Sequence, residues 1–428
     1  MASTPHIIQL PNTLTSTPLR EILDGLDKPT GQRTLPTILL YDERGLRLYD
    51  DITTKAPEYY LFAAEEQILC DNSPEIIRMM HGGGPVRNGE ILLELGAGAL
   101  RKTSHLLRAA AQISPRVSTP TVTYLALDLE KRELDRTLSL MSTSELGPQL
   151  EGRVRIGGLC GTYDDGIAYV RHGGLSEMQQ ASPLLSASTP NEVDKTRNGD
   201  DINPILEPMV PSDFKDANPH GLSPLSPTRS DGGGIAPSDL LPPSSPSTLT
   251  DVQSTYSTDY EETPPIHFLF LGSSIGNFKR DEASDFLRSL PLRPWIASSE
   301  SSETPFGDTL LLGLDHDNQP ALIEEAYNDP AGYTRKFIMN GLAGVRRAFE
   351  EGGMDKDVIS AFEEDQWDYK ETYNTVEKRH EGRYLSLNRK SVSLQGKDVI
   401  IDAGEAVHVE HSYKASHYAP FQNLRTKV

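Results

Sequence analysis

The residues best suited to bind a ligand lie in the turn Glu94-Leu95-Gly96-Ala97-Gly98, which follows an apolar run. Glycine lets a backbone approach a ligand closely and adopt angles that other residues avoid. In a doubly wound sheet, ligands bind beyond the carboxyl ends of the strands, where such a turn would lie. Two glycines also occur in many ordinary tight turns, so the ligand must be inferred from the residues around them.

An acidic residue and an arginine narrow the choice of ligand. Asp128 ends the next apolar run, where a carboxylate can accept hydrogen bonds from both hydroxyl groups of a ribose. Arg101 stands where the dinucleotide fingerprint has its third glycine, which disfavours a pyrophosphate. Thr162 and Tyr163 follow a third run, where an adenine ring would lie. The pattern favours a nucleoside cofactor without pyrophosphate, and we expect S-adenosyl-L-methionine.

Histidines cluster near the end of the chain. His408, His411 and His417 lie around Glu410, but their spacing does not match a zinc pattern. We therefore predict no metal site here. No Ser-His-Asp or Cys-His arrangement for nucleophilic catalysis stands out either.

Strands and helices that alternate along the chain must position these residues. Apolar runs bounded by Gly, Asp or Pro are typical of strands buried on both faces, and they span 91–95, 122–127, 154–159, 267–271 and 309–314. Helical patterns lie between them, for example at 102–111 and 280–290. This alternation predicts an α/β fold with a doubly wound, Rossmann-like parallel sheet of the class I methyltransferase kind.

The flanking segments predict a smaller α+β substrate-binding domain over the top of the sheet. Residues 17–80 and 319–364 have helical patterns, and alternation at 369–377 and 383–394 predicts a hairpin that turns at Arg379-His380-Glu381-Gly382. The predicted organisation is 15–82 and 319–418 for the substrate-binding domain, 83–182 and 266–318 for the two halves of the core, 183–265 for an insertion and 419–428 for a tail.

The insertion, 183–265, contains 14 of the 31 prolines and many Ser, Thr, Asp and Gly residues. It has too little apolar surface to offset the entropy of ordering it, so we predict that it is disordered. Its Ser-Pro and Thr-Pro pairs are candidate phosphorylation sites, although an inert surface insertion is the simpler interpretation.

The composition argues against several kinds of partner. The net charge of −21 disfavours nucleic acid and anionic membranes. No run approaches the roughly 18 apolar residues of a membrane span, and the first residues have no signal-peptide pattern. Cys70 and Cys160 are the only cysteines, which fits a reducing compartment. We expect a cytoplasmic protein with a small-molecule substrate and leave its oligomeric state open.

Four strings that occur in order resemble a known family. They are Leu40-Tyr41-Asp42-Glu43-Arg44-Gly45, Pro57-Glu58-Tyr59-Tyr60, Leu93-Glu94-Leu95-Gly96-Ala97-Gly98 and Phe270-Leu271-Gly272-Ser273-Ser274-Ile275-Gly276-Asn277-Phe278. They closely resemble the histidine-specific S-adenosylmethionine-dependent methyltransferases of ergothioneine biosynthesis, especially the fungal ones. The resemblance runs from about residue 15 to about residue 418, apart from the insertion. It implies methylation of the α-amino group of L-histidine to its trimethyl betaine, hercynine, the first step of that pathway.

The resemblance also implies roles for residues at matching positions. The cofactor site would consist of Tyr41, Gly96, Gly98, Lys102, Asp128, Thr162 and Tyr163. The catalytic residues would be Tyr41, near the reacting methyl group and amine, and Asn277 and Tyr327, which would hold the substrate carboxylate. The imidazole would be surrounded by Tyr59, Glu410 and Ser412.

Two alternatives stay open at this point. The chain also resembles fungal enzymes that methylate tryptophan or dimethylallyltryptophan, although Glu410 favours histidine because an indole has no second ring nitrogen. The other alternative is an inactive, truncated binding protein with the methyltransferase fold. Residues 420–428 show no strand pattern where the family continues, so two edge elements of the sheet would be missing.

Overall fold

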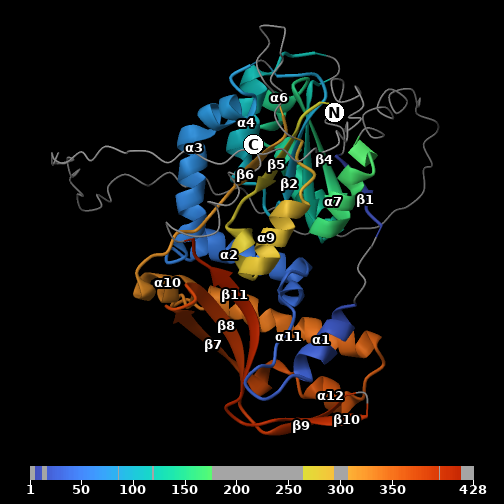
Figure 1. Cartoon of the computed structure of the whole chain (residues 1–428), viewed down its shortest axis with the longest axis vertical. Coiled ribbons are helices and arrows are strands. Elements are labelled where there is room, and N and C mark those ends of the chain that lie inside the picture. The colour runs from blue at the N-terminus through green and yellow to red at the C-terminus, as the bar shows by residue number, and fades with distance from the viewer. Residues whose placement is uncertain are drawn as a thin grey trace, which may run out of the picture. The chain divides into compact units, whose positions relative to one another are not determined.

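A computed structural model of the chain describes residues 5–11, 17–84, 86–117, 120–175, 264–293, 307–394 and 396–415 (Figure 1). The predicted insertion lies outside these residues except for its last two, and the predicted tail lies outside them entirely. The described residues belong to one compact unit. None of their helices is both long enough and apolar enough to pass through a bilayer.

Six parallel strands form the central sheet in the order β1-β4-β3-β2-β5-β6. They are β1 (His6–Gln9), β2 (Glu90–Leu95), β3 (Val122–Asp128), β4 (Val154–Cys160), β5 (Ile266–Phe270) and β6 (Thr309–Leu312). The apolar runs correctly predicted the five strands from β2 onward, because strands covered on both faces need apolar residues at successive positions. The edge strand β1 was not predicted, since its four residues alternate only weakly.

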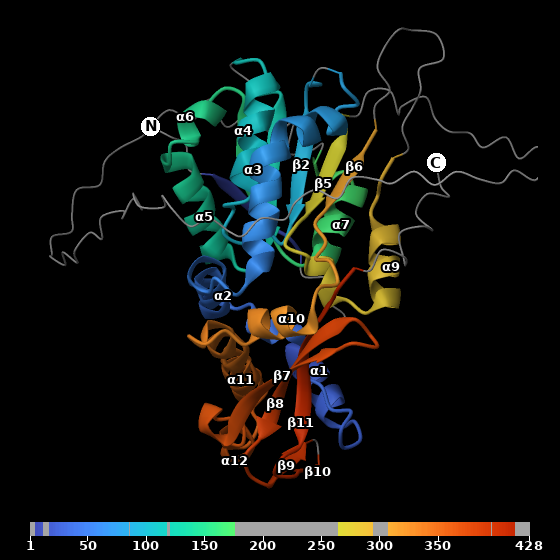
Figure 2. The ribbon, with the colours of Figure 1, turned by 90° about the vertical axis from the view of Figure 1, so that its left-hand side faces the viewer.

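Helices cover both faces of this sheet, as Figure 2 shows. One face packs against α3 (Tyr60–Met80), α4 (Thr103–Ile113), α5 (Lys131–Thr143) and α6 (Gly147–Leu150). The other face packs against α7 (Tyr163–Arg171) and α9 (Arg280–Ser289). This arrangement confirms the prediction of a doubly wound α/β sheet.

A second part of the unit has its own apolar core, which includes the buried Trp367 and Tyr384. Its helical elements are α1 (Pro18–Leu26), η1 (Thr37–Leu40), α2 (Glu43–Lys55), α10 (Pro320–Tyr327), α11 (Tyr333–Glu351), α12 (Lys356–Ser360) and η5 (Glu364–Gln366). Its strands are β7 (Trp367–Asn374), β8 (Arg379–Ser386), β9 (Lys390–Leu394), β10 (Lys397–Ile401) and β11 (Ala406–Tyr413). The antiparallel order is β11-β8-β7, with β10 and β9 forming a separate pair. The short helix η4 (Ser274–Asn277) contacts β11 and links the two parts.

The predicted position of the hairpin turn is wrong. Residues 379–382 lie within β8, and the turn is formed instead by residues 375–378, with Lys378 in the left-handed region at φ +55°. The side-chain oxygen of Asn374 accepts hydrogen bonds from the backbone N–H groups of Val376 and Glu377 at 3.1 and 3.0 Å. This local bonding by an asparagine favours a turn over a continued strand. Residues 390–394 form β9 and pair with β10 rather than β7.

A buried carboxylate joins three elements beneath the glycine turn. Glu94 of β2 accepts hydrogen bonds from the Thr103 hydroxyl of α4, at 2.7 Å, and from the Tyr124 hydroxyl of β3. Burial raises the pKa of Glu94 to about 7, although these donors oppose the shift. The folded state therefore favours the protonated carboxyl more than the unfolded state does.

We predict that this group makes the protein less stable as the pH rises. The pKa of Glu94 is about 7 when folded and ordinary when unfolded, so its destabilising effect is absent below pH 4.5 and complete only above pH 7. When the pH is raised from 5 to 8, the unfolding free energy of the wild type should fall by about 2–3 kcal/mol more than that of the Glu94→Gln variant, which has no carboxyl group to ionise. Urea unfolding at the two pH values measures this, and an unchanged loss in the variant would contradict it.

Candidate active site

A cavity of about 360 Å³ lies at the carboxyl ends of the sheet strands, where the second part of the unit meets them. It is lined from the sheet side by the loops after β2, β3, β4 and β5, and from the other side by η1, α2, α10 and β11. The sequence-predicted site residues that line it are Tyr41, Tyr59, Gly96, Gly98, Asp128, Thr162, Tyr163, Asn277, Tyr327, Glu410 and Ser412. Lys102 is the one predicted site residue that does not.

The glycine turn needs its glycines for two reasons. Gly96 and Gly98 have φ values of +70° and +55°, in the left-handed region that side chains disfavour. A Cβ atom on Gly96 would lie 2.6 Å from the hydroxyl oxygen of Tyr163, whereas one on Gly98 would meet nothing within 4 Å. The turn therefore lets Tyr163 lie directly on its backbone and leaves open space at Gly98.

Asp128 is fixed by the same turn. The Gly98 N–H donates to one carboxylate oxygen at 2.9 Å, and the Leu129 N–H donates to the other at 2.7 Å. Burial raises the pKa of Asp128, and these two backbone donors oppose that shift. Each oxygen keeps a further lone pair, which matches the donor pair of a ribose diol.

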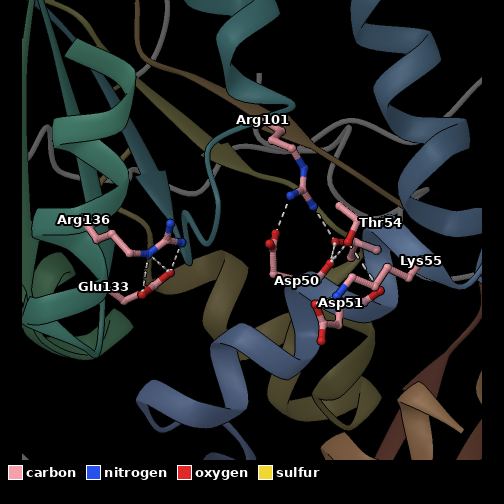
Figure 3. A network of polar contacts seen from close by, with 8 residues as sticks. Asp50, Asp51, Thr54, Lys55, Arg101, Glu133 and Arg136 are labelled. Atoms are coloured by element: carbon pink, nitrogen blue, oxygen red, sulfur yellow. Dashed lines mark hydrogen bonds and ion pairs between the residues drawn. The ribbon is translucent and has the colours of Figure 1, made fainter. Parts of the chain in front are cut away.

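Lys102 and Arg101 hold the turn to neighbouring helices. Lys102 forms an ion pair with Glu65 of α3, and Glu65 also accepts the Gly272 N–H at 2.9 and 2.8 Å. Arg101 forms an ion pair with Asp50 of α2, as Figure 3 shows. Both basic residues line a smaller cavity of about 80 Å³ beside the turn. Arg101 occupies the position of the third glycine in the dinucleotide fingerprint, and its ion pair with Asp50 of α2 explains why an arginine stands there.

A buried lysine that the sequence did not reveal organises the other end of the cavity. Lys414 is 1% exposed and donates to the hydroxyl of Tyr327 at 2.8 Å and to Ser412 at 3.2 Å. It also forms an ion pair with Asp315 at 2.7 Å, while the Tyr327 hydroxyl donates to Ser412 at 2.9 Å. The Tyr327 ring stacks on His380 with centroids 3.9 Å apart. Position 414 follows 410 and 412 at the two-residue period of a strand face, which was the available signal.

Glu410 presents a buried carboxyl group to the cavity. The residue is 6% exposed, and its carboxylate makes no hydrogen bond to the described part of the chain. Burial raises the pKa of Glu410 to about 7, and Lys414 opposes the shift. An ionised carboxylate in this position lacks a partner, so it would gain strongly from a ligand that donates a hydrogen bond.

Aromatic residues and one amide complete the wall. The Asn277 side-chain amide donates to the Tyr41 hydroxyl at 3.4 Å, and the hydroxyls of Tyr49 and Tyr59 lie 3.2 Å apart. Tyr41 and Tyr49 both contact the Phe337 ring, with centroids 5.5 and 5.6 Å away. The cavity thus combines an apolar, aromatic wall with a few neutral donors and two acids, Asp128 and Glu410.

Comparisons with known proteins identify the family. The model of the family described as "Histidine-specific methyltransferase, SAM-dependent" matches residues 19–187 and 246–425. This chain belongs to that family. It is 30% identical to the L-tryptophan methyltransferase of Psilocybe serbica over 97% of this chain and 85% of that protein.

Two further relatives of this methyltransferase carry other substrates or pathways in their names. Ergothioneine biosynthesis protein 1 of Neurospora crassa is 26% identical over 97% of this chain, which spans only 33% of that protein. The histidine N-alpha-methyltransferase of Mycobacterium tuberculosis is 23% identical over 92% of this chain and 83% of that protein. The methyltransferase therefore uses S-adenosylmethionine, and the left-handed turn, the fixed Asp128 and the open space at Gly98 fit this cofactor.

We predict that Gly96→Ala weakens S-adenosylmethionine binding at least about 10-fold. The new methyl group would displace Tyr163, and a left-handed alanine adds about 1–2 kcal/mol of strain. Gly31→Ala is the matched control, because Gly31 has φ +80° but a Cβ there would meet nothing within 4 Å. Titration calorimetry measures the affinity. Equal cofactor affinities in the two variants would contradict the assignment of the turn to the cofactor.

Proposed function

We propose that this enzyme transfers methyl groups from S-adenosylmethionine to the α-amino group of L-histidine and forms hercynine, the first step of ergothioneine biosynthesis. The observation that carries the proposal is Glu410, a buried carboxyl without a hydrogen bond to the described chain that faces an aromatic cavity. The imidazole of histidine supplies the N–H that such a group lacks. The family description and the name of the Mycobacterium tuberculosis relative support histidine as the substrate, and the name of the Neurospora crassa relative supports the pathway.

Asn277 and Tyr327 are suited to hold the substrate carboxylate. Both line the cavity, and both can offer neutral donors once the Tyr327 O–H turns from Ser412 to the carboxylate, so that binding does not place an exposed cation beside the positively charged sulfonium of the cofactor. Lys414 donates to Tyr327 from behind, which makes that hydroxyl a stronger donor. Asp315 balances the charge of Lys414.

The α-amino group must lose its proton before it can attack. The cofactor supplies an activated methyl group, and the amine displaces the sulfide in line. An α-amino group has a pKa of about 8, so a modest shift in the cavity yields the neutral amine without a strong base. The main contribution of the chain is then to orient the amine and exclude water, with Tyr41, which follows η1, next to Asn277 from the sheet side of the cavity.

Ser412 is suited to bind the second ring nitrogen. Its oxygen accepts a hydrogen bond from Lys414 that does not depend on Tyr327, which leaves its own O–H to donate. A neutral imidazole has one N–H and one unprotonated nitrogen, so Glu410 and Ser412 together match both. Tyr59 lies edge-on to Tyr327, with centroids 5.8 Å apart, and forms the apolar wall for the ring.

Tryptophan is the second candidate substrate. The 30% identity to an L-tryptophan methyltransferase over 97% of this chain favours it, as does the aromatic wall. An indole N–H can also donate to Glu410. It would, however, leave the Ser412 hydroxyl without an acceptor, and an unpaired buried donor costs about 1–3 kcal/mol.

We expect histidine to be consumed faster than tryptophan when both compete for one enzyme preparation. Mass spectrometry of the products separates the masses of the mono-, di- and trimethylated amino acids. Methylated tryptophan with unchanged histidine would overturn the proposal. Methylation of neither, together with cofactor binding by calorimetry, would point to a different amine substrate.

We predict that Glu410→Gln raises KM for histidine about 10- to 100-fold with a smaller change in kcat. The variant loses a charge-assisted hydrogen bond worth about 1.5–3 kcal/mol. In the wild type, KM should fall as the pH rises through 7, because the pKa of Glu410 is about 7 and only the ionised form accepts fully. The variant should lack this contribution to the pH profile. Glu371→Gln is the matched control, since burial also raises the pKa of Glu371 but the residue does not line the cavity. Equal effects of both substitutions would contradict the role of Glu410.

A further inference from the structure

A cluster of two histidines and one glutamate lies far from the cavity. His81 follows the last residue of α3, Glu90 begins β2, and His267 is the second residue of β5. Because β2 and β5 are parallel, Glu90 and His267 lie at the amino ends of these strands, whereas the cavity lies beyond the carboxyl ends. The six residue steps from Glu90 to Gly96 separate the two places by about 20 Å.

Three ligand atoms converge in this cluster. Nδ1 of His81 lies 2.8 Å from Oε2 of Glu90, and Nε2 of His267 lies 3.9 Å from the same oxygen. All three atoms lie within 4.8 Å of one another. In tetrahedral zinc sites with bonds of about 2.0–2.1 Å, neighbouring ligand atoms are about 3.3 Å apart. The observed separations bracket this value, so small side-chain rotations would place all three around one ion.

The three atoms are buried and unsatisfied. The exposed fractions are 8% for His81 and 1% each for Glu90 and His267. The two histidine nitrogens lie close enough to Oε2 of Glu90 for electrostatic attraction, but none of these contacts has the geometry of a hydrogen bond within the described chain. Buried polar atoms without partners are rare in folded proteins and call for an explanation such as a bound ion. Here the three unsatisfied atoms all point at the same place.

In His267 and Glu90, the polar atom that faces away from the cluster forms a hydrogen bond to another residue. Nδ1 of His267 is bonded to the Thr309 hydroxyl of β6 at 2.8 Å, which directs Nε2 toward the cluster. Oε1 of Glu90 accepts the Arg87 N–H at 2.7 Å, which directs Oε2 the same way. Metal-binding histidines and carboxylates are commonly oriented by such second partners.

We propose that His81, Glu90 and His267 form a structural site for a divalent transition-metal ion, most suitably Zn²⁺. Two imidazole nitrogens and one carboxylate are a ligand set that zinc accepts, with a fourth position for water. The ion would neutralise Glu90 and tie the end of α3 to β2 and β5. These strands carry the Gly96 and Gly272 loops at their other ends, so the ion would support the frame of the cavity without entering it.

Metal binding to the full-length protein tests this directly. After treatment with a chelator and dialysis against Zn²⁺, plasma mass spectrometry should find one tightly held zinc ion per chain. A chromophoric chelator in competition then gives the affinity. Addition of zinc at 100 times its dissociation constant should raise the midpoint of thermal unfolding by about 4 °C. Failure of the wild-type protein to retain zinc would overturn the proposal.

Variants separate this site from other histidines. His267→Gln and Glu90→Gln should weaken zinc binding by more than about 100-fold, because even loss of an orienting partner costs about 10- to 100-fold. Thr309→Val removes only such a partner, so it should keep the fold and weaken zinc about 10-fold. His411→Asn is the control, since His411 and His408 form another close pair, 3.2 Å apart. Loss of zinc in the control but not in Thr309→Val or Glu90→Gln would overturn the assignment.

Discussion

The buried ion pair between Lys414 and Asp315 is the interaction on which the active site depends. Asp315 follows the last strand of the parallel sheet, and Lys414 follows β11 of the second part, so the pair joins the two parts at the cavity. Removal of one partner from a buried pair leaves an unpaired charge and costs about 3–5 kcal/mol. The remaining hydrogen bonds of Lys414 go to Tyr327 and Ser412. The ion pair that joins the two parts therefore also orients the hydroxyl groups of Tyr327 and Ser412, which line the cavity.

This arrangement solves an electrostatic problem. The cofactor is a sulfonium, and the substrate carboxylate needs strong donors close to it. A lysine in the cavity would repel the sulfonium. Lys414 instead lies behind Tyr327, with its ammonium 4.7 Å from the ring centroid, and Asp315 balances its charge. The hydrogen bond from Lys414 polarises the neutral Tyr327 hydroxyl and makes it a stronger donor toward the cavity. The net charge in the cavity therefore stays low.

The sequence predicted the sheet well because buried parallel strands need continuous apolar runs, as in Leu92-Leu93 and Ala126-Leu127. Eleven of the twelve predicted site residues line the cavity, because strand ends and family strings mark them, but they make up fewer than half of its lining. The hairpin turn was misplaced because the side-chain bonding of Asn374 outweighed the glycine at position 382. Lys414 was missed because a lysine at a strand end usually faces solvent. His81 and Glu90 lie more than 170 residues before His267 in the sequence, and only the fold brings the three residues together.

The long helix α3 connects these observations. Near its start, Glu65 binds the Gly272 backbone and Lys102, and at its end His81 meets the strands that lead to the same two loops. The 16 residue steps from Glu65 to His81 span about 24 Å of helix. Contacts at both ends of this helix with β2, β5 and their loops help to fix the separation of the glycine turn and the Gly272 loop. The mainly aromatic and neutral groups of the second part then complete the cavity, whose cofactor side is held by the sheet, by α3 and by the ion pair of Arg101 with Asp50 of α2.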